Sequence, residues 1–318
     1  MVSKMKNQFT RAACFLLGLA VLLQGFGWLY RPRNNNASGG TLLEHAKGYL
    51  SEPADSIDVF FVGSSEFYRG VCPMRIWDES GITTYDMSTS SQRLYQTAFY
   101  VRQILETHHP KLIVLDAYAL IRRDEADPSL FYGLCDVFPL LDYHGNWKLF
   151  GPQELMSPVA YTNHVAAKGF RPKSRAAKAN TRRFMRKTAK SAPFGWINRW
   201  HMRSIETMCQ KAGVELLIVA APSTINWNYS RHNAMQAYAD EKGIPFLDLN
   251  VVVDEVGIDP ATDYLDGGDH LNGPGAKKVS IYLAHYLEEH YGLPDHRKDP
   301  AYASWQEDYD TIYDYEKK

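Results

Sequence analysis

DVFFVGSSEFYR, residues 58–69, is the stretch of the sequence that decides the fold. The unbroken apolar run at 59–62 predicts a strand buried on both faces, as in a parallel sheet. Gly63 permits a sharp turn, and Ser64 and Ser65 stand where a following helix would begin. Ligands bind at the carboxyl ends of the strands in an open α/β sheet, so a serine here is a candidate nucleophile beside free helix N–H groups. The structural alternative is a pair of serines that cap the helix.

The rest of the chain alternates short apolar runs with helical segments, which is the pattern of a doubly wound sheet. We expect further strands near residues 82–87, 112–115, 215–220 and 245–249, and helices over about 92–106 and 274–290. Right-handed crossovers would place the loops after the strands at one edge of the sheet. Those loops contain Ser65, Ser88, Asp116, Pro222 and His270. Their convergence predicts a site at this edge.

A second motif lies far downstream, in YLDGGDHLN, residues 264–272. His270 is flanked by carboxylates and glycines just before a predicted helix. A histidine with a carboxylate beside it is what a serine needs as general base and orienting partner. Two carboxylates are available, Asp266 four residues before the histidine and Asp269 one residue before it.

Gly63-Ser64-Ser65 after the first strand, with Asp and His close together near the C-terminus, resembles the SGNH (GDSL-type) hydrolase superfamily. The resemblance covers about residues 56–290 and implies a three-layer, flavodoxin-like, five-stranded parallel sheet. It implies Ser65 as the nucleophile, with Ser64 as the alternative, and His270 as the base. The family's carboxylate stands three residues before the histidine, where this chain has a glycine. We therefore expect Asp266 to orient His270, with one extra loop residue absorbed by the glycines, and Asp269 as the alternative.

The oxyanion hole is where the sequence departs most from the family pattern. The backbone N–H of Ser65 carries over, and the second-block position falls near Ser88. The third-block Gly-x-Asn-Asp has no counterpart, since Asp116 follows the third strand and an ionised carboxylate cannot donate to an oxyanion. We expect Asp116 to bind substrate or a neighbouring side chain instead. Gln92 and Tyr118 are the remaining candidate donors. Ser223, after the fourth strand, is expected to line the acceptor side or simply to begin a helix.

Basic residues flank an apolar run over residues 12–30. Because about 20 apolar residues span a bilayer, this run predicts one transmembrane helix. Trp28 and Tyr30 end it in place of a small-residue cleavage site, which favours an uncleaved anchor. We expect residues 1–33 to form a single-pass anchor with its N-terminus inside, residues 34–55 a tether and lead-in, and the remaining chain an extracytoplasmic domain.

The anchor, Gly-Ser-Ser-Glu and Asp-His-Leu together resemble the membrane-anchored branch of the superfamily. That branch includes the D-alanyl transfer protein of teichoic acid modification and the SGNH partners of membrane-bound O-acyltransferases. The resemblance implies that such an acyltransferase is a candidate partner. The catalytic domain is expected over residues 56–292, with an acidic and aromatic tail at 293–318 that either lies over the domain or is disordered.

A long helical insertion is expected over about residues 121–198. Its second half, Arg171–Lys190, is rich in lysine and arginine and contains no acidic residue. Such a run is commonly a solvated helical face. It equally suits an anionic lipid or polymer, as a lid or docking arm over the site.

These observations predict an acyl transferase that acts on cell-envelope carbohydrate or polymer through a Ser65 acyl-enzyme. An esterase or deacetylase that uses water is the first alternative, and a non-catalytic envelope protein that binds polymer or docks on an acyltransferase is the second. The formal net charge of -1 argues against nucleic-acid binding. The sequence has no Walker loop, Gly-x-Gly-x-x-Gly or His-Glu-x-x-His motif, so it implies no metal and no cofactor.

Overall fold

The computed structural model describes residues 2–36, 44–143 and 151–314. At its centre is a five-stranded parallel sheet with the order β2-β1-β3-β4-β5. The strands are β1 Val59–Val62, β2 Thr84–Asp86, β3 Leu112–Asp116, β4 Glu215–Ala220 and β5 Phe246–Asp248. This is the flavodoxin-like order, and the predicted α/β class and doubly wound sheet are confirmed.

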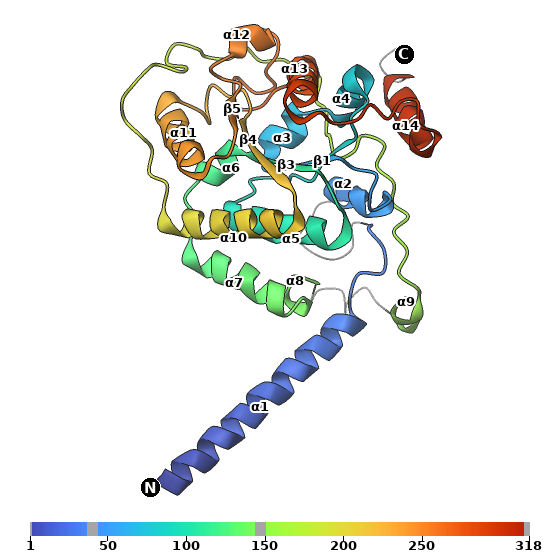
Figure 1. The fold of residues 1–318 in the computed structure, drawn as a ribbon, viewed down its shortest axis with the longest axis vertical. Helices are drawn as coiled ribbons and strands as arrows, with labels where there is room; N and C mark the ends of the chain where they lie inside the picture. Colours follow the sequence, from blue (N-terminus) through green and yellow to red (C-terminus); the bar gives the residue numbers. More distant parts are fainter. Residues whose placement is uncertain (1, 37–43, 144–150, 315–318) are drawn as a thin grey trace.

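Helices cover both faces of the sheet (Figure 1). On one face lie α3 Ser65–Gly70, α4 Pro73–Ser80 and α13 Gly273–Tyr291, and on the other α5 Leu94–Thr107 and α10 Trp196–Ala212. Alternate residues of β1 enter different clusters, since Val59 and Phe61 pack with α13 while Phe60 and Val62 pack with α5 and α10. The apolar run is continuous because both of its faces are buried.

Further elements follow the strands at the carboxyl edge of the sheet or precede the first strand. They are α2 Glu44–Lys47, η1 Gly48–Ser51, α6 Ala117–Ile121, α11 Tyr229–Lys242 and α12 Val253–Val256. Helix α11 packs on β5 and α6. The edge strand β5 is thereby covered.

The insertion between β3 and β4 begins with helices and continues as an extended segment. Its helices are α7 Ala126–Val137, α8 Leu140–Tyr143 and α9 Pro152–Met156. Residues 157–195, which we call the strap, contain no helix or strand. In Figure 1 the strap climbs the body from α9, crosses the end furthest from α1 and descends to α10.

The structure therefore corrects the expectation that the basic run is helical. Like charges four residues apart, such as Arg182 and Arg186 or Arg183 and Lys187, destabilise a helix. The backbone instead bonds to neighbouring loops, with Ala177 N donating to Tyr264 O at 2.8 Å.

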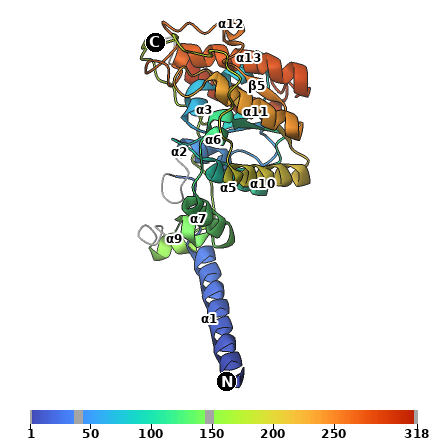
Figure 2. The ribbon, with the colours of Figure 1, turned by 90° about the vertical axis from the view of Figure 1, so that its left-hand side faces the viewer.

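An apolar helix, α1 Val2–Leu29, projects from the body at its N-terminal end (Figures 1 and 2). Among the described residues it is the one helix long and apolar enough to cross a membrane. The chain after α1 packs against the domain at Asn35. This residue is fully buried, and its side chain accepts a hydrogen bond from Asn163 N at 2.8 Å. Residues 37–43 of the expected tether lie outside the described residues.

The C-terminal segment packs on the domain as η3 Pro300–Tyr302 and α14 Ala303–Asp314. Trp305 is buried, with its ring centroid 5.7 Å from that of Trp77 on α4. The fully buried ammonium of Lys168, in the strap, lies 2.6 Å from Asp308 Oδ2 and 2.5 Å from Glu52 Oε1. This buried ion cluster ties α14 to the strap and to the segment before β1.

Candidate active site

The two serines after β1 have different surroundings. Ser64 is fully buried at the N-cap of α3, where its Oγ donates to Asp116 Oδ2 at 2.5 Å and accepts from Glu66 N at 3.3 Å. Ser65 is the first residue of α3 and is partly exposed. Its Oγ lies 2.8 Å from Nε2 of His270. Ser64 therefore holds the turn, and Ser65 faces the histidine.

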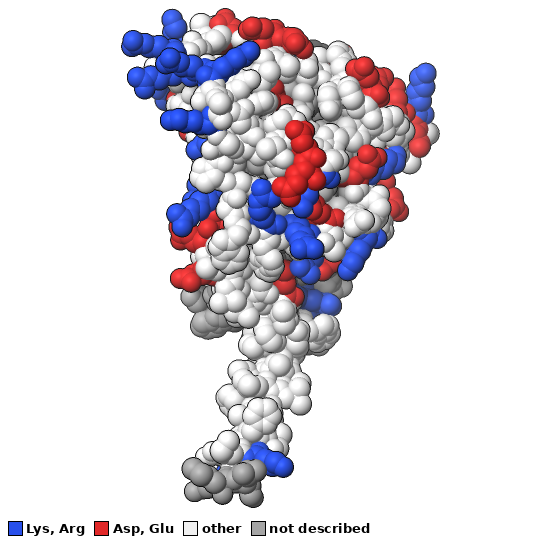
Figure 3. All heavy atoms as spheres, turned by 60° about the vertical axis from the view of Figure 1, so that its left-hand side comes forward, with Lys and Arg blue, Asp and Glu red and all other residues white. Residues whose placement is uncertain are grey.

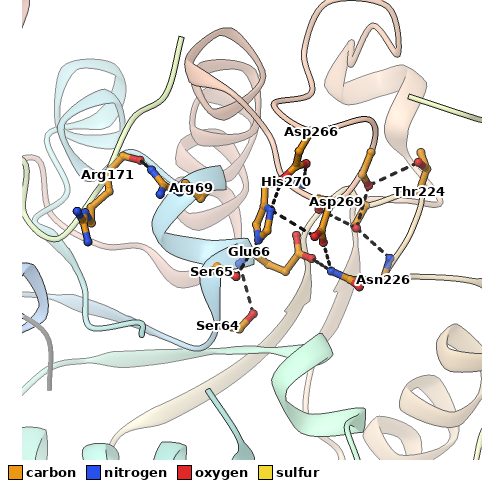
Figure 4. Close-up of polar contacts among 12 residues, drawn as sticks. Ser64, Ser65, Glu66, Arg69, Arg171, Thr224, Asn226, Asp266, Asp269 and His270 are labelled. Atoms are coloured by element: carbon orange, nitrogen blue, oxygen red, sulfur yellow. Dashed lines mark hydrogen bonds and ion pairs between the residues drawn. The ribbon is translucent and has the colours of Figure 1, made fainter. Parts of the chain in front are cut away.

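His270 stands between Ser65 and Asp266 in the loop before α13 (Figure 4). Its Nδ1 lies 2.7 Å from Asp266 Oδ2, and its backbone N donates to Asp266 Oδ1 at 2.8 Å. Asp269 is the second neighbour, with Oδ2 3.6 Å from the same Nδ1, beyond hydrogen-bonding distance. The structure thus brings together Ser65, His270 and Asp266, with Asp269 beside them.

Two glycines give the histidine loop its shape. Gly267 and Gly268 have φ of 82° and 117°, values that L side chains rarely adopt. A Cβ on Gly268 would lie 1.9 Å from Thr224 Oγ1. These glycines are where the loop accommodates the one additional residue between Asp266 and His270.

Ser223 supports this loop from the end of β4. It is buried, and its Oγ donates to Gly268 O at 3.1 Å and Asp269 O at 2.9 Å. Thr224 N adds a bond to Gly268 O at 2.8 Å. Ser223, expected on the acceptor side, thus holds the main chain of the loop.

The remaining sequence candidates are bound to their own surroundings. Ser88 is fully buried, and its backbone N–H donates to Asp86 Oδ1 at 3.0 Å. Gln92 is also fully buried; its Oε1 accepts from Thr89 Oγ1, and its Nε2 donates to Thr97 Oγ1. Asp116 accepts from Ser64 and from Tyr118 N at 2.8 Å, so it binds a neighbouring side chain. The Tyr118 ring lies beneath the guanidinium groups of Arg122 and Arg231, 5.3 and 5.5 Å from its centroid.

Sequence reasoning missed a contact between Asn226 and Glu66. The Asn226 amide donates to Glu66 Oε1 at 2.6 Å and also to Asp269 Oδ1. Glu66 follows Ser65 directly and is buried, which raises the pKa of its carboxyl well above the usual value. A carboxyl that holds its proton more strongly than usual and an amide therefore lie beside the serine and the second aspartate. The one sign of this contact in the sequence was Glu66 itself, a carboxylate in the turn that directly follows a buried strand.

Among the described residues, two groups of side chains have metal-ligating atoms close to one another: Asp266, Asp269 and His270, and Glu52, His164 and Asp308. In the first, Asp266, Asp269 and His270 meet beside Ser65, where the histidine nitrogens already face Ser65 and Asp266. In the second, Glu52 and Asp308 surround the Lys168 ammonium, which supplies the positive charge there.

No protein family model and no curated protein matches the chain. Solved structures with similar folds include three described as hydrolases. An acylhydrolase from Bacteroides fragilis is 14% identical, with coverage of 76% of this chain and 91% of its own and a TM-score of 0.38. GDSL-like lipases from Bacteroides thetaiotaomicron and Parabacteroides merdae are 12% and 10% identical. They cover 74% and 77% of this chain, and 88% and 99% of their own, with TM-scores of 0.37 and 0.38. At these values the function has to be argued from the side chains.

Proposed function

We propose that the chain is a serine-dependent acyl-ester enzyme in which Ser65 is the nucleophile, His270 the general base and Asp266 the orienting carboxylate. One observation carries the proposal, the continuous series of contacts from Ser65 Oγ to His270 Nε2 at 2.8 Å and from His270 Nδ1 to Asp266 at 2.7 Å. Nucleophile, base and orienting group within hydrogen-bonding reach are the arrangement that activates a serine hydroxyl.

The reaction has two half-reactions. As Ser65 Oγ attacks the ester carbonyl, its proton passes to His270 Nε2, and the same proton then goes to the leaving alkoxide as the acyl-enzyme forms. In the second half-reaction an acceptor hydroxyl loses its proton to His270 as its oxygen attacks the acyl carbonyl, and His270 then returns that proton to Ser65 Oγ as the acyl–Ser65 bond breaks. Asp266 holds the Nδ1–H tautomer and stabilises the imidazolium that forms in each step.

The backbone N–H of Ser65 is the first oxyanion donor in this proposal. It belongs to the first turn of α3, whose N–H groups lack helical acceptors. The N–H groups on either side of it are bound, at Ser64 by Asp116 and at Glu66 by the Ser64 hydroxyl. Within the described ranges that of Ser65 has no acceptor, which leaves it for a developing oxyanion.

We further propose that the acceptor is an anionic envelope polymer that lies along the strap. Its basic side chains are exposed and make no salt bridge to any described residue; they are Arg171, Lys173, Arg175, Lys178, Arg182, Arg183, Arg186, Lys187 and Lys190. The strap borders the histidine loop, because Gly273 N donates to Lys173 O at 2.9 Å. A row of unpaired cations beside a nucleophile concentrates a polyanion there.

The position of this basic surface favours polymer over lipid. Figure 3 shows lysine and arginine side chains gathered at the end of the molecule opposite α1. If α1 is a membrane anchor, headgroups of the same membrane lie at the other end. Acyl transfer to the polymer and hydrolysis by water use the same acyl-enzyme, and the acceptor decides between them.

The test uses the full chain in phosphatidylcholine nanodiscs with p-nitrophenyl acetate. Turnover should vanish in Ser65→Ala and in His270→Ala, while Ser157→Ala, an exposed serine on the strap, should keep it. A fluorophosphonate should add its mass to the peptide that contains Ser65. Turnover or labelling that survives Ser65→Ala would refute the assignment.

The polymer proposal has a separate test. Binding of a polyphosphate to the full chain should weaken in the double variant Arg182→Glu/Arg186→Glu. The matched control, Arg203→Glu/Lys211→Glu, changes the same charge at exposed positions on α10. Equal losses in both variants would mean that only net charge matters, and the strap would not be the binding surface.

A further inference from the structure

Helix α7 turns an apolar face outward. Leu130, Phe131, Leu134 and Val137 are between 40% and 66% exposed and share one side of the helix at the spacing of successive turns. The opposite side faces the domain, where Ser129 Oγ lies 3.0 Å from His201 Nε2 and Cys135 is buried. An apolar stripe on the solvent side of a helix that is already packed on its other side indicates a second contact surface.

After the first turn of α7, no charged side chain lies on the outward face of this helix. Asp136, near the end of α7, points to the side and pairs with Arg102 at 2.9 Å. Asp127 is in the first turn. The apolar residues between them are therefore free of nearby charge on the same face.

Helix α7 is joined to the end of α1. Gln24 Nε2 donates to Val137 O at 2.6 Å, and Tyr143 Oη, in α8, donates to Gly27 O at 2.7 Å. In Figures 1 and 2 α7 lies at the upper end of α1 and runs across it. The C-terminal end of α7, where Val137 is exposed, thus lies beside the last turns of α1, where Phe26 and Trp28 are also exposed.

These contacts fix the depth of α7 relative to α1. Gln24 and Gly27 lie within about 9 Å of Tyr30 along the helix, at 1.5 Å per residue. That is where a helix leaves the hydrocarbon and enters the headgroup layer. Trp28 is at this level, with the guanidinium of Arg31 5.3 Å from its ring centroid, and tryptophan and arginine are typical of that layer.

We propose that the outward face of α7 lies in the headgroup layer of the bilayer that contains α1; this rests on the proposed role of α1 as a membrane anchor. Helix α7 is then an in-plane amphipathic helix, and it holds the domain at a fixed angle to the membrane. The occupant is lipid because the apolar face begins beside the exposed apolar residues at the end of α1 and is held at interfacial depth by the bonds to Gln24 and Gly27.

The experiment uses the full chain in phosphatidylcholine vesicles with an environment-sensitive fluorophore on a single cysteine. Added cysteines, Leu130→Cys, Leu134→Cys and Val251→Cys, are introduced together with Cys14→Ala. The other native cysteines are buried, and the Cys14→Ala protein alone gives the blank. Doxyl-labelled lipid quenches probes that contact the bilayer. Circular dichroism melting curves establish that each labelled protein is folded.

Native Cys14, exposed on α1, is the positive control, and Val251, exposed after β5, is the negative one. Probes at positions 130 and 134 should be quenched to at least half the extent seen at Cys14, with blue-shifted emission, while the probe at 251 stays unquenched. Strong quenching at Cys14 with none at 130 and 134 would overturn the placement of α7 but keep the anchor. No quenching at Cys14 would overturn both. A probe at position 134 with blue-shifted emission but no quenching by doxyl lipid would mean that a protein, and not lipid, covers this face.

Discussion

Replacing Asp266 by asparagine should harm acylation more than removing its side chain. Asp266 uses both oxygens on His270, Oδ1 accepting from the backbone N–H at 2.8 Å and Oδ2 facing Nδ1 at 2.7 Å. In Asp266→Asn the amide oxygen of the asparagine must accept from the backbone N–H of His270, so its NH2 group must face His270 Nδ1. That forces the proton onto Nε2, and His270 can then no longer accept a proton from Ser65.

The magnitudes follow from these contacts. The wrong tautomer in a comparable triad costs about 10⁴-fold in rate, and we expect a loss of this size for Asp266→Asn. Asp266→Ala removes a charge-assisted hydrogen bond of about 1.5–3 kcal/mol, or roughly 10–150-fold. The alanine variant also keeps Asp269, whose Oδ2 stays 3.6 Å from Nδ1.

The assay is the second-order rate constant for inactivation by a fluorophosphonate, because it reports attack by Ser65 without any acceptor. Asp269→Ala is the matched control and should lose less than Asp266→Ala. An asparagine variant that reacts as fast as the alanine variant, or faster, would refute the tautomer argument. A larger loss for Asp269→Ala would transfer the orienting role to Asp269.

Three further changes probe the surroundings of the site and the buried ion cluster. Because burial raises the pKa of Glu66, the folded state keeps a proton that the unfolded state loses, so this residue lowers the unfolding free energy as pH rises above about 4.3. In urea titrations the stability of Glu66→Gln relative to the unmodified protein should therefore increase from pH 5 to pH 8, and a constant difference would contradict the raised pKa. Lys168→Met removes the buried cation that contacts both Glu52 and Asp308 and leaves His164 as their remaining partner; it should cost about 3–5 kcal/mol in the same measurement, with part of it regained by adding Asp308→Asn. No recovery in the double variant would show that the loss came from packing. Gly268→Ala places a Cβ against Thr224 Oγ1 and should lower ester turnover about 10²-fold by displacing the histidine loop. Full turnover would mean that the loop tolerates the shift.

Much of the fold could be predicted because the strands are buried on both faces. The runs at 59–62 and 217–220 are apolar and buried at every position, so no exposed polar residue interrupts their pattern. The strap could not be predicted, because a run of basic residues has the same composition whether it forms a solvated helix or an extended segment. Its conformation is decided by backbone bonds to segments distant in sequence, such as Arg171 N to Tyr68 O on α3 at 2.8 Å.

The site was predictable where neighbouring residues carry the signal. Ser65 and His270 stand in recognisable turns, and the glycines before His270 indicated a loop that could accommodate Asp266 at its unusual spacing. Asn226 was missed because a lone asparagine in a loop has no pattern, and it lies 160 residues from Glu66, which it contacts. Gln92 looked like a free donor because the bonds that occupy its amide form only when its own turn folds.

The way the strap is held has a consequence for how enzymes of this design can diversify. Between Lys173 and Ala179 its backbone is bound at every second residue to the segments before and after His270, while its basic side chains are exposed. An insertion or deletion here would move the catalytic loop, but exchange of an outward side chain would not. On the proposal that the strap binds the acceptor, selection can retune acceptor preference one residue at a time, with the length of this segment kept constant and the Ser65–His270 contact undisturbed.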